Sequence, residues 1–296
     1  MSAEAPRALV TGSSGFVGRR LAERLVAQGW TVHVVRRAST EAPAPAGTQA
    51  HRHDGTTAHL AAIAAAVKPD VTFHLASLFL AQHGPEDVVP LIRNNVEFGA
   101  QLLEAVASAG CRRLADAGTS WQHFGGADYD PVCLYAATKQ AFADVLAYWV
   151  AARGFAATSL QLTDTYGPDD GRAKLIPMLL KAARERRRVA LSPGEQRLDL
   201  VHVDDVAEAF VIAGRRLLEG LPPSGHREVY AVSSGHPMRL RDVVELLRAA
   251  TGLPIDVEWG ARSYRPREVM EPWNGPTLPG WSPHIALREG LAGLET

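Results

Sequence analysis

The chain has 296 residues, enough for one large domain or for one domain with an appendage. Hydrophobic residues make up 46% and charged residues 21%, a composition that provides a sizeable core and excludes a disordered tail or a membrane protein. The 31 lysines and arginines nearly balance the 32 aspartates and glutamates, so the formal net charge is −1. This balance argues against sequence-independent binding of nucleic acid, but it allows a local basic pocket.

Two cysteines, Cys111 and Cys133, are too few for a disulfide framework or for a zinc site of their own. Residues 1–6 lack the apolar stretch of a signal peptide, and no run of about 18 apolar residues follows. The sequence therefore predicts a cytoplasmic protein without a membrane span, a metal site or a nucleic-acid partner.

The first half of the chain alternates strand and helix patterns. Apolar and β-branched runs predict strands at residues 7–11, 31–35, 49–53, 71–75, 112–117 and 157–163. Apolar residues at helical spacing, several stretches ending in glycine, predict helices at residues 16–28, 57–67, 94–109 and 135–153. This alternation indicates βαβ units, and hence an α/β fold with a doubly wound parallel sheet covered by helices on both faces.

After Tyr166 the alternation loosens, and prolines and glycines become frequent. We expect residues 1–166 to form the sheet domain, with residues 198–233 returning to it. Residues 167–197 and 234–296 are expected to form a smaller substrate-binding lobe.

The segment from Thr11 to Gly18 reads T-G-S-S-G-F-V-G and lies between the first predicted strand and the first predicted helix. Glycines let the backbone approach a pyrophosphate, and the free N–H groups of a helix N-terminus attract its charge. The pattern predicts dinucleotide binding on a Rossmann-type sheet, and the alternative is a purely structural turn.

The end of the second predicted strand indicates which dinucleotide binds. An NAD site usually carries an acidic residue about 20 residues beyond the glycines, where it holds the adenosine ribose. This chain has Arg36 and Arg37 there, and a guanidinium can pair with a 2′-phosphate that an acid would repel. The pair favours NADP(H) over NAD(H), unless both arginines are simply solvated loop charges.

Tyr135 and Lys139 are four residues apart and so share one face of a predicted helix. A nearby cation favours the phenolate and is expected to lower the pKa of Tyr135, which could then act as a general acid or base at a carbonyl. By spacing alone, such a pair is more often an incidental surface contact.

Further motifs follow the glycine turn in a fixed order. They are His74-Leu75-Ala76-Ser77, Asn94-Asn95-Val96, Gly118-Thr119-Ser120, Tyr135-Ala136-Ala137-Thr138-Lys139, Tyr166-Gly167-Pro168, Val203-Asp204-Asp205-Val206, Arg265-Pro266-Arg267-Glu268 and Leu278-Pro279-Gly280-Trp281. Together they resemble the extended short-chain dehydrogenase/reductase family, specifically its nucleotide-sugar epimerase/dehydratase branch, over nearly the whole chain.

The resemblance implies a catalytic set of Ser120, Tyr135 and Lys139. Tyr135 would donate or accept the proton, Lys139 would hold the nicotinamide ribose, and Ser120, with Thr119 as a close rival, would bind the carbonyl oxygen. The cofactor residues that it implies, together with the two arginines, are Gly12, Ser14, Gly15, Phe16, Val17, Arg36, Arg37, Asp54, Gly55, Leu75, Ala76, Ser77, Asn94, Tyr135, Lys139 and Thr163. The implied substrate residues are Thr119, Ser120, Asp164, Lys174, Leu175, Arg197 and Arg265, of which Lys174, Leu175, Arg197 and Arg265 would hold a nucleoside diphosphate.

Departures from the family pattern reduce the number of reactions that the protein could catalyse. Trp121 and Gln122 stand where the dehydratases carry an Asp-Glu pair, and neither can titrate as a carboxylate, so dehydration is disfavoured. Cys111 and Cys133 do not match the second acid/base of enzymes that epimerise beside a ketone. Asp164 stands where many members of the family carry an asparagine, and this difference leaves the identity of the substrate less well defined.

Reduction of a ketone, or 4-epimerisation through a transient ketone, therefore remains. We expect an NADPH-dependent 4-ketoreductase of a nucleotide-linked 4-keto-6-deoxyhexose, in deoxysugar biosynthesis, working as a homodimer. The alternatives are a nucleotide-sugar 4-epimerase with bound NAD, a reductase of another carbonyl compound, and a non-catalytic dinucleotide-sensing regulator.

Overall fold

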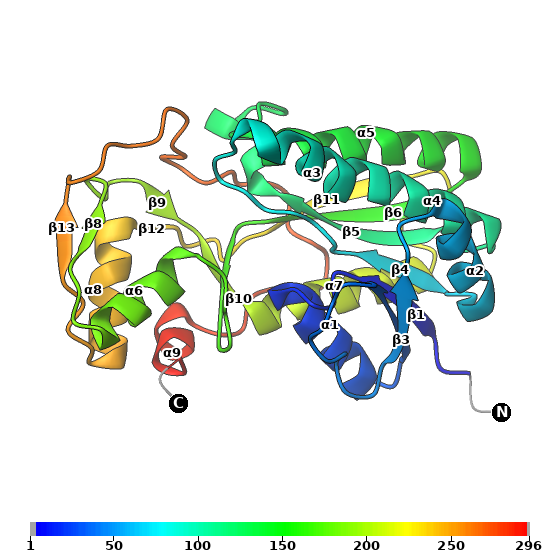
Figure 1. Ribbon diagram of the computed structural model, residues 1–296, viewed down its shortest axis with the longest axis horizontal. Coiled ribbons are helices and arrows are strands. Elements are labelled where there is room, and N and C mark those ends of the chain that lie inside the picture. The colour runs from blue at the N-terminus through cyan, green and yellow to red at the C-terminus, as the bar shows by residue number, and fades with distance from the viewer. Residues whose placement is uncertain (1–3, 295–296) are drawn as a thin grey trace.

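The computed structural model describes residues 4–294, and its larger lobe is built on one parallel sheet (Figure 1). The strand order is β11-β6-β5-β4-β1-β2-β3, and each neighbouring pair is parallel. The strands are β1 (Arg7–Thr11), β2 (Thr31–Arg37), β3 (Gln49–His53), β4 (Val71–His74), β5 (Arg113–Thr119), β6 (Ala156–Leu162) and β11 (Arg227–Val232). The predicted doubly wound α/β fold is confirmed, and β11 comes from the segment expected to return to the sheet.

Helices cover both faces of this sheet because its central strands are buried on both sides. One face is covered by α1 (Phe16–Ala27) and α7 (Val203–Leu218), whose apolar side chains share a core with β1, β2 and β4. The other face is covered by α2 (Thr57–Val67), α4 (Phe98–Ser108) and α5 (Leu134–Arg153). None of the helices within residues 4–294 is long and apolar enough to cross a membrane.

The strand order reverses direction between β1 and β4. From β1 the chain adds β2 and β3 on one side, whereas β4, β5 and β6 are added on the other. Connections after β1 and β4 therefore diverge, and a crevice opens at the carboxyl ends of these strands, where α/β sheets bind ligands.

The helix predicted at residues 94–109 is interrupted. The chain instead forms α3 (Val88–Ile92), a π-helical turn at Arg93–Glu97, and then α4. The wider turn lets Asn95, only 1% exposed, reach Leu78 and Thr138 with its side-chain amide. This interruption is a tertiary effect, because the partners of Asn95 lie far from it in the sequence. Single π turns inside helices are frequent at functional sites.

The smaller lobe lies at the left of Figure 1 and has its own apolar core. Its helices are α6 (Leu175–Arg184), α8 (Leu240–Thr251) and α9 (Leu287–Ala292). Short strand pairs complete it: β8 (Val189–Leu191) with β13 (Val257–Trp259), and β9 (Arg197–Leu198) with β12 (Met238–Arg239). A third pair, β7 (Asp164–Tyr166) with β10 (Leu200–His202), leads from the sheet to this lobe.

Candidate active site

The turn between β1 and α1 brings backbone groups unusually close together. Gly12 has a φ of +81°, and a Cβ atom there would lie 2.6 Å from the backbone nitrogen of Ala76. A Cβ at Gly18 would overlap the carbonyl oxygen of Gly12. Helix α1 follows Gly15 without a side-chain cap, and its first turn has no acidic residue. Its free N–H groups are therefore available to an anion such as a pyrophosphate.

A cleft of about 710 Å³, the β2-side cleft, opens beside this turn. It is lined by many of the predicted cofactor residues: Gly12, Ser14, Gly15, Arg36, Arg37, Asp54, Gly55, Leu75, Ala76, Ser77 and Asn94. Arg36 donates from Nη2 to the carbonyl of Ala42. The Asp54 carboxylate accepts from the Thr56 amide (2.9 Å) and hydroxyl (2.8 Å), which lowers its pKa. This cleft thus contains both basic and acidic side chains, at the neighbouring ends of β2 and β3.

The central cleft, of about 510 Å³, shares Gly12, Gly15, Leu75 and Ser77 with the β2-side cleft. It brings together the predicted catalytic residues Ser120, Tyr135 and Lys139, and it is also lined by Phe16, Val17, Thr119, Thr163, Asp164 and Lys174. Ser120 follows β5, and Tyr135 and Lys139 lie in the first two turns of α5. The end of β5 and the first two turns of α5 therefore line the same cleft.

Two hydroxyls of this cleft are already engaged. The Thr119 hydroxyl accepts from the backbone nitrogen of Trp121 (3.3 Å) at the start of the 3₁₀ turn Ser120–Gln122. The Thr163 hydroxyl donates to the Val232 carbonyl (2.9 Å). The Thr119 hydroxyl only accepts in this bond and still has its proton to donate, so Thr119 and Ser120 both stay candidates for the group that would meet a substrate carbonyl.

The expected lowering of the Tyr135 pKa is wrong. Burial raises the pKa of Tyr135 to about 12, and a hydrogen bond with Ser77 opposes that rise. The reason is that desolvation of the phenol disfavours its charged form more than the neighbouring groups favour it. Tyr135 therefore keeps its proton at neutral pH.

Lys139 is only 4% exposed, so it is not the incidental surface contact that spacing alone would suggest. Burial lowers the pKa of Lys139 to about 8, and the negative charge of Asp116 opposes that fall. Asp116 lies on β5 beneath α5, is 3% exposed and accepts from the Ser159 hydroxyl (2.5 Å). The buried carboxylate thus helps the ammonium to stay charged.

Two aromatic residues that the sequence did not indicate as site residues, Phe79 and Trp121, also line the central cleft. The Phe79 ring meets the Tyr135 ring edge-on with 5.0 Å between centroids, and the Trp121 ring lies 5.6 Å from Phe79. Phe79 is 37% exposed, a high value for a large apolar side chain. Only the fold brings Phe79, from the loop after β4, next to Tyr135 on α5.

The outer cleft, of about 340 Å³, continues from the central cleft into the smaller lobe and contains Asp164, Lys174, Leu175 and Arg265. The Lys174 ammonium lies 3.7 Å from Asp164 and 3.8 Å from the centre of the Phe79 ring. Arg265 forms two hydrogen bonds with Glu268 (2.9 and 2.7 Å) and lies 5.1 Å from the Trp121 ring. Two cations therefore flank the aromatic pair.

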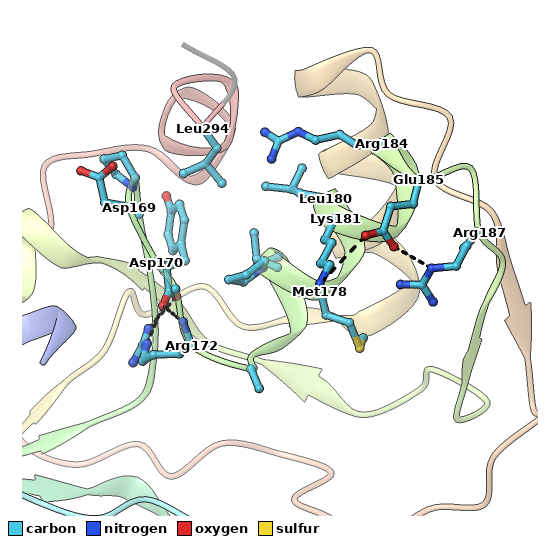
Figure 2. A pocket seen from close by; sticks show the side chains of 17 residues that line it. Asp169, Asp170, Arg172, Met178, Leu180, Lys181, Arg184, Glu185, Arg187 and Leu294 are labelled. Carbon is cyan, nitrogen blue, oxygen red and sulfur yellow. Dashed lines mark hydrogen bonds and ion pairs between the residues drawn. The ribbon is translucent and has the colours of Figure 1, made fainter.

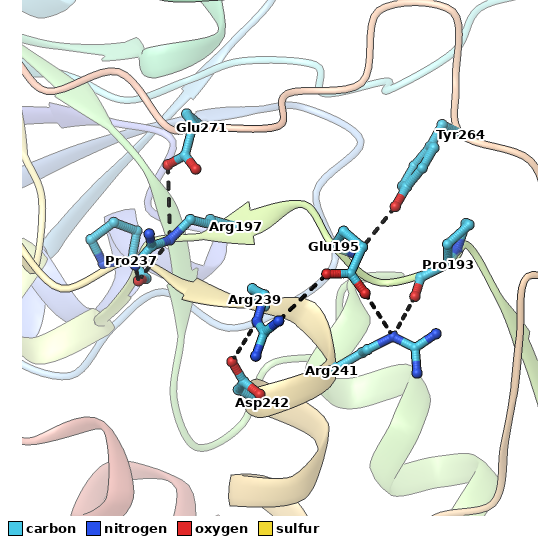
Figure 3. Close-up of polar contacts among 9 residues, drawn as sticks. All are labelled: Pro193, Glu195, Arg197, Pro237, Arg239, Arg241, Asp242, Tyr264 and Glu271. Carbon is cyan, nitrogen blue, oxygen red and sulfur yellow. Dashed lines mark hydrogen bonds and ion pairs between the residues drawn. The ribbon is translucent and has the colours of Figure 1, made fainter.

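Arg197 is placed differently from the other predicted substrate residues. It is exposed on β9, donates to the Pro237 carbonyl (2.6 Å) and lies 3.8 Å from Glu271 (Figure 3). It is not among the residues that line the central or outer cleft as described for residues 4–294. Its role toward a diphosphate stays a prediction.

A further cleft of about 990 Å³ lies between the loop at residues 167–173, α6 and Leu294 (Figure 2). Arg172 lines both this cleft and the central cleft. Its guanidinium is held by the buried Asp170 (2.7 Å) and by the Thr165 carbonyl (2.8 Å), and it lies 4.3 Å above the Phe16 ring. Sequence reasoning did not identify Arg172, which anchors the loop against the central cleft.

A sequence profile of the NAD dependent epimerase/dehydratase family matches residues 8–231. The chain belongs to this family. As an extended short-chain dehydrogenase/reductase it is an NAD(P)-dependent oxidoreductase-type enzyme. The match contains the glycine turn, Ser120, Tyr135 and Lys139, the same residues that the fold gathers at the two inner clefts.

Individual relatives align over nearly the whole chain. UDP-glucose 4-epimerase of Streptomyces lividans is 30% identical over 308 residues, covering 94% of this chain and 92% of the relative. The dTDP-6-deoxy-L-talose 4-dehydrogenase (NAD(P)(+)) of Kitasatospora kifunensis is 26% identical over 321 residues, covering 98% and 95%. The solved structure of MoeE5 in complex with UDP-glucose and NAD has a TM-score of 0.83 at 26% identity, covering 97% and 96%.

The residues of the two inner clefts fit a nicotinamide dinucleotide. The Gly12 position has no room for a Cβ, and the uncapped end of α1 faces the same turn. When bound, the dinucleotide would supply or accept a hydride at the central cleft. Arg36 and Arg37 in the β2-side cleft would hold its adenosine half, and Tyr135 and Lys139 in the central cleft would hold its nicotinamide half.

Proposed function

We propose that the protein reduces the keto group of a nucleotide-linked 4-keto-6-deoxyhexose, with NADPH as the hydride source. The observation that carries this proposal is the meeting of Ser120, Tyr135 and Lys139 in one cleft, which continues outward to Lys174 and Arg265. Two cations at the outer end suit a diphosphate, and a proton donor at the inner end suits a carbonyl.

Each of the three catalytic groups in the central cleft has a separate role in the reduction. The Ser120 hydroxyl donates a hydrogen bond to the carbonyl oxygen and holds it near Tyr135. As the carbonyl carbon gains the hydride, the oxygen takes the phenolic proton of Tyr135, and the C=O bond becomes a C–OH group. The buried positive charge of Lys139 stabilises the phenolate that is left. A pKa of about 12 keeps Tyr135 protonated before this step, as a proton donor must be.

A second candidate function is 4-epimerisation, since a UDP-glucose 4-epimerase is among the relatives. Its transient ketone would use the same Ser120, Tyr135 and Lys139. The relative named as a dTDP-6-deoxy-L-talose 4-dehydrogenase supports reduction at the 4-position of a 6-deoxy sugar. Arg36 and Arg37 support a cofactor with a 2′-phosphate, which is exchanged between turnovers and not recycled in place.

A panel of nucleotide-4-keto-6-deoxyhexoses should consume NADPH when mixed with the purified protein, as measured by absorbance. UDP-glucose and UDP-galactose serve as controls, because an epimerase interconverts them without net cofactor consumption. Consumption with at least one keto sugar supports reduction. Interconversion of the control sugars, with no consumption across the panel, would instead establish the epimerase.

NADPH should bind about tenfold more tightly than NADH, and Arg36→Ala should remove most of that difference, because a guanidinium–phosphate pair contributes roughly 1.5–3 kcal/mol. Isothermal titration of both cofactors into the wild type and the variant measures the ratio. The exposed Arg153, at the end of α5 and not among the residues described as lining the three clefts, gives a matched control as Arg153→Ala. An unchanged ratio in Arg36→Ala would show that the 2′-phosphate lies elsewhere.

A further inference from the structure

The 3₁₀ turn that follows β5 is held from two directions. Its carbonyl side is tied by backbone hydrogen bonds, since the Trp121 oxygen accepts from the Val132 nitrogen (2.9 Å). The Gln122 oxygen likewise accepts from the Asp130 nitrogen (2.8 Å). Its amide side depends on a side chain, because the Thr119 nitrogen donates to Oε1 of Gln122 (3.1 Å). The side chain of Gln122 therefore closes the turn at the end of β5.

The same side chain reaches across to α5. Nε2 of Gln122 donates to Oε1 of Gln140 (2.9 Å), and Nε2 of Gln140 donates to Oδ1 of Asp144 (2.9 Å) one helical turn further on. Gln122 is only 1% exposed, whereas Gln140 is half-buried and directly follows Lys139. A row of side-chain hydrogen bonds thus connects the turn after β5 with the helix that bears Tyr135 and Lys139.

The direction of each bond in this row is fixed at its two ends. A backbone N–H can only donate, so the Thr119 nitrogen requires the oxygen of Gln122, and the nitrogen of Gln122 is then left to donate to Gln140. At the other end an ionised carboxylate can only accept, so Asp144 requires the nitrogen of Gln140. Both amides are therefore held in one orientation, and neither can turn over without breaking two hydrogen bonds.

The row matters because the reacting groups come from different elements. Reduction requires a hydroxyl of Thr119 or Ser120 and the phenol of Tyr135 to meet the same carbonyl oxygen. Their separation depends on how the turn after β5 is fixed against α5. A misplacement of about 1 Å can cost roughly a hundredfold in rate. Gln122 and Gln140 are not among the residues described as lining the central cleft, so they can act on the reaction only through this separation.

We propose that Gln122 is a positioning residue: through its bond to Gln140, it sets the distance between the hydroxyls of the turn and the phenol of Tyr135. This inference rests on the proposed function, because it assumes that those groups share one carbonyl oxygen. Position 122 is where the dehydratases carry the glutamate of their Asp-Glu pair. An amide cannot exchange a proton as that carboxyl group does, and here both of its ends make bonds that hold the turn.

Two substitutions of Gln140 isolate the bond that crosses from the turn to the helix. Methionine has no acceptor for Nε2 of Gln122, whereas glutamate keeps that acceptor and loses only the bond to Asp144. We expect Gln140→Met to lower kcat for keto-sugar reduction about tenfold and Gln140→Glu to stay within about threefold of the wild type. In both variants, KM for the sugar and Kd for NADPH should change by less than about threefold, because only the chemical step is affected.

Gln122→Met should lower kcat by roughly 30- to 100-fold, because the Thr119 nitrogen also loses its acceptor. Adding Gln140→Met should lower kcat no further, since both changes remove the same bond. Gln28→Met is the matched control and should keep the wild-type kcat. Gln28, at the end of α1, is half-buried, also makes side-chain hydrogen bonds, and is not among the residues described as lining the three clefts.

A kcat of Gln140→Met within about twofold of the wild type, even with a lowered melting temperature, overturns the inference and leaves the reductase proposal standing. Equal losses of kcat in Gln140→Met and Gln140→Glu also overturn it, because the bond to Asp144 would then be the one that matters. Weakening of NADPH binding in step with kcat does the same, since the whole site would then be disturbed. If Gln122→Met does not fold, as judged by circular dichroism, the two variants of the half-buried Gln140 still decide the question.

The assay also separates this inference from the proposed function. If the wild type reduces no keto sugar, the same variants are assayed for interconversion of UDP-glucose and UDP-galactose, which would use the same hydroxyls and phenol. The expected losses in that assay would support the positioning role while overturning the reductase proposal. Turnover in neither assay overturns the proposed function and this inference with it.

Discussion

Tyr135→Phe is expected to lower kcat for ketone reduction by roughly 10²–10⁴-fold, the usual contribution of a general acid. The phenylalanine ring keeps the edge-on contact with Phe79 but has no proton to give to the developing alkoxide. Because the change removes one hydroxyl from a partly buried ring, the fold and the dinucleotide affinity should be preserved. Single-turnover kinetics with NADPH and a keto sugar, together with a titration of NADPH alone, separate the two effects.

Tyr129→Phe is the matched control, since Tyr129 is 48% exposed and lies outside the residues described as lining the three clefts that would hold cofactor and substrate. It should retain the wild-type kcat. If Tyr135→Phe kept more than about a tenth of the wild-type kcat, Tyr135 would have no role as the proton donor.

Gly12→Ala is expected to weaken dinucleotide binding by roughly a hundredfold or more. Two penalties act on the same residue: a left-handed φ of +81°, which costs an alanine about 1–2 kcal/mol, and a Cβ placed 2.6 Å from the Ala76 nitrogen. Relief of the clash would move the β1–α1 turn away from the loop after β4. The N–H groups at the start of α1 would then no longer point toward the pyrophosphate. Fluorescence or calorimetric titration of NADPH measures the loss.

Gly171→Ala provides the control for this change, because a Cβ there has no heavy atom within 4 Å and Gly171 is not among the glycines with positive φ. It should bind NADPH like the wild type. Wild-type affinity in Gly12→Ala would mean that the turn has a structural role only and that the dinucleotide is held elsewhere.

Local sequence patterns were sufficient to predict most of the strands and helices of the larger lobe. Every predicted strand of the first 163 residues is present, with ends displaced by at most two residues, because alternation of buried apolar runs and amphipathic helices is a local property. The interruption of the helix at residues 94–109 could not be predicted in this way. It depends on the buried bonds of Asn95 to Leu78 and Thr138, which are distant in the sequence.

Some residues of the candidate site could likewise be predicted from local sequence, and others could not. Glycine at position 12 and the four-residue spacing of Tyr135 and Lys139 are visible in the chain, and the structure places these residues in adjoining clefts. Phe79 and Arg172 carry no local signal, since one is an aromatic residue in a loop and the other an arginine among many. Their importance comes from the neighbours that the fold supplies: Tyr135 and Lys174 for the first, Phe16 for the second.

The sequence by itself determined the class of fold and the glycine turn, because periodicity and backbone freedom are set by residues close together in the chain. Only the tertiary structure decided the direction in which the pKa of Tyr135 is shifted. Desolvation depends on everything packed around a group, so it raises the pKa of Tyr135 to about 12 where the neighbouring lysine alone would lower it. Tertiary packing likewise decided which residues share the central cleft, because the segments after β4, β5 and β6 become neighbours only in the folded sheet.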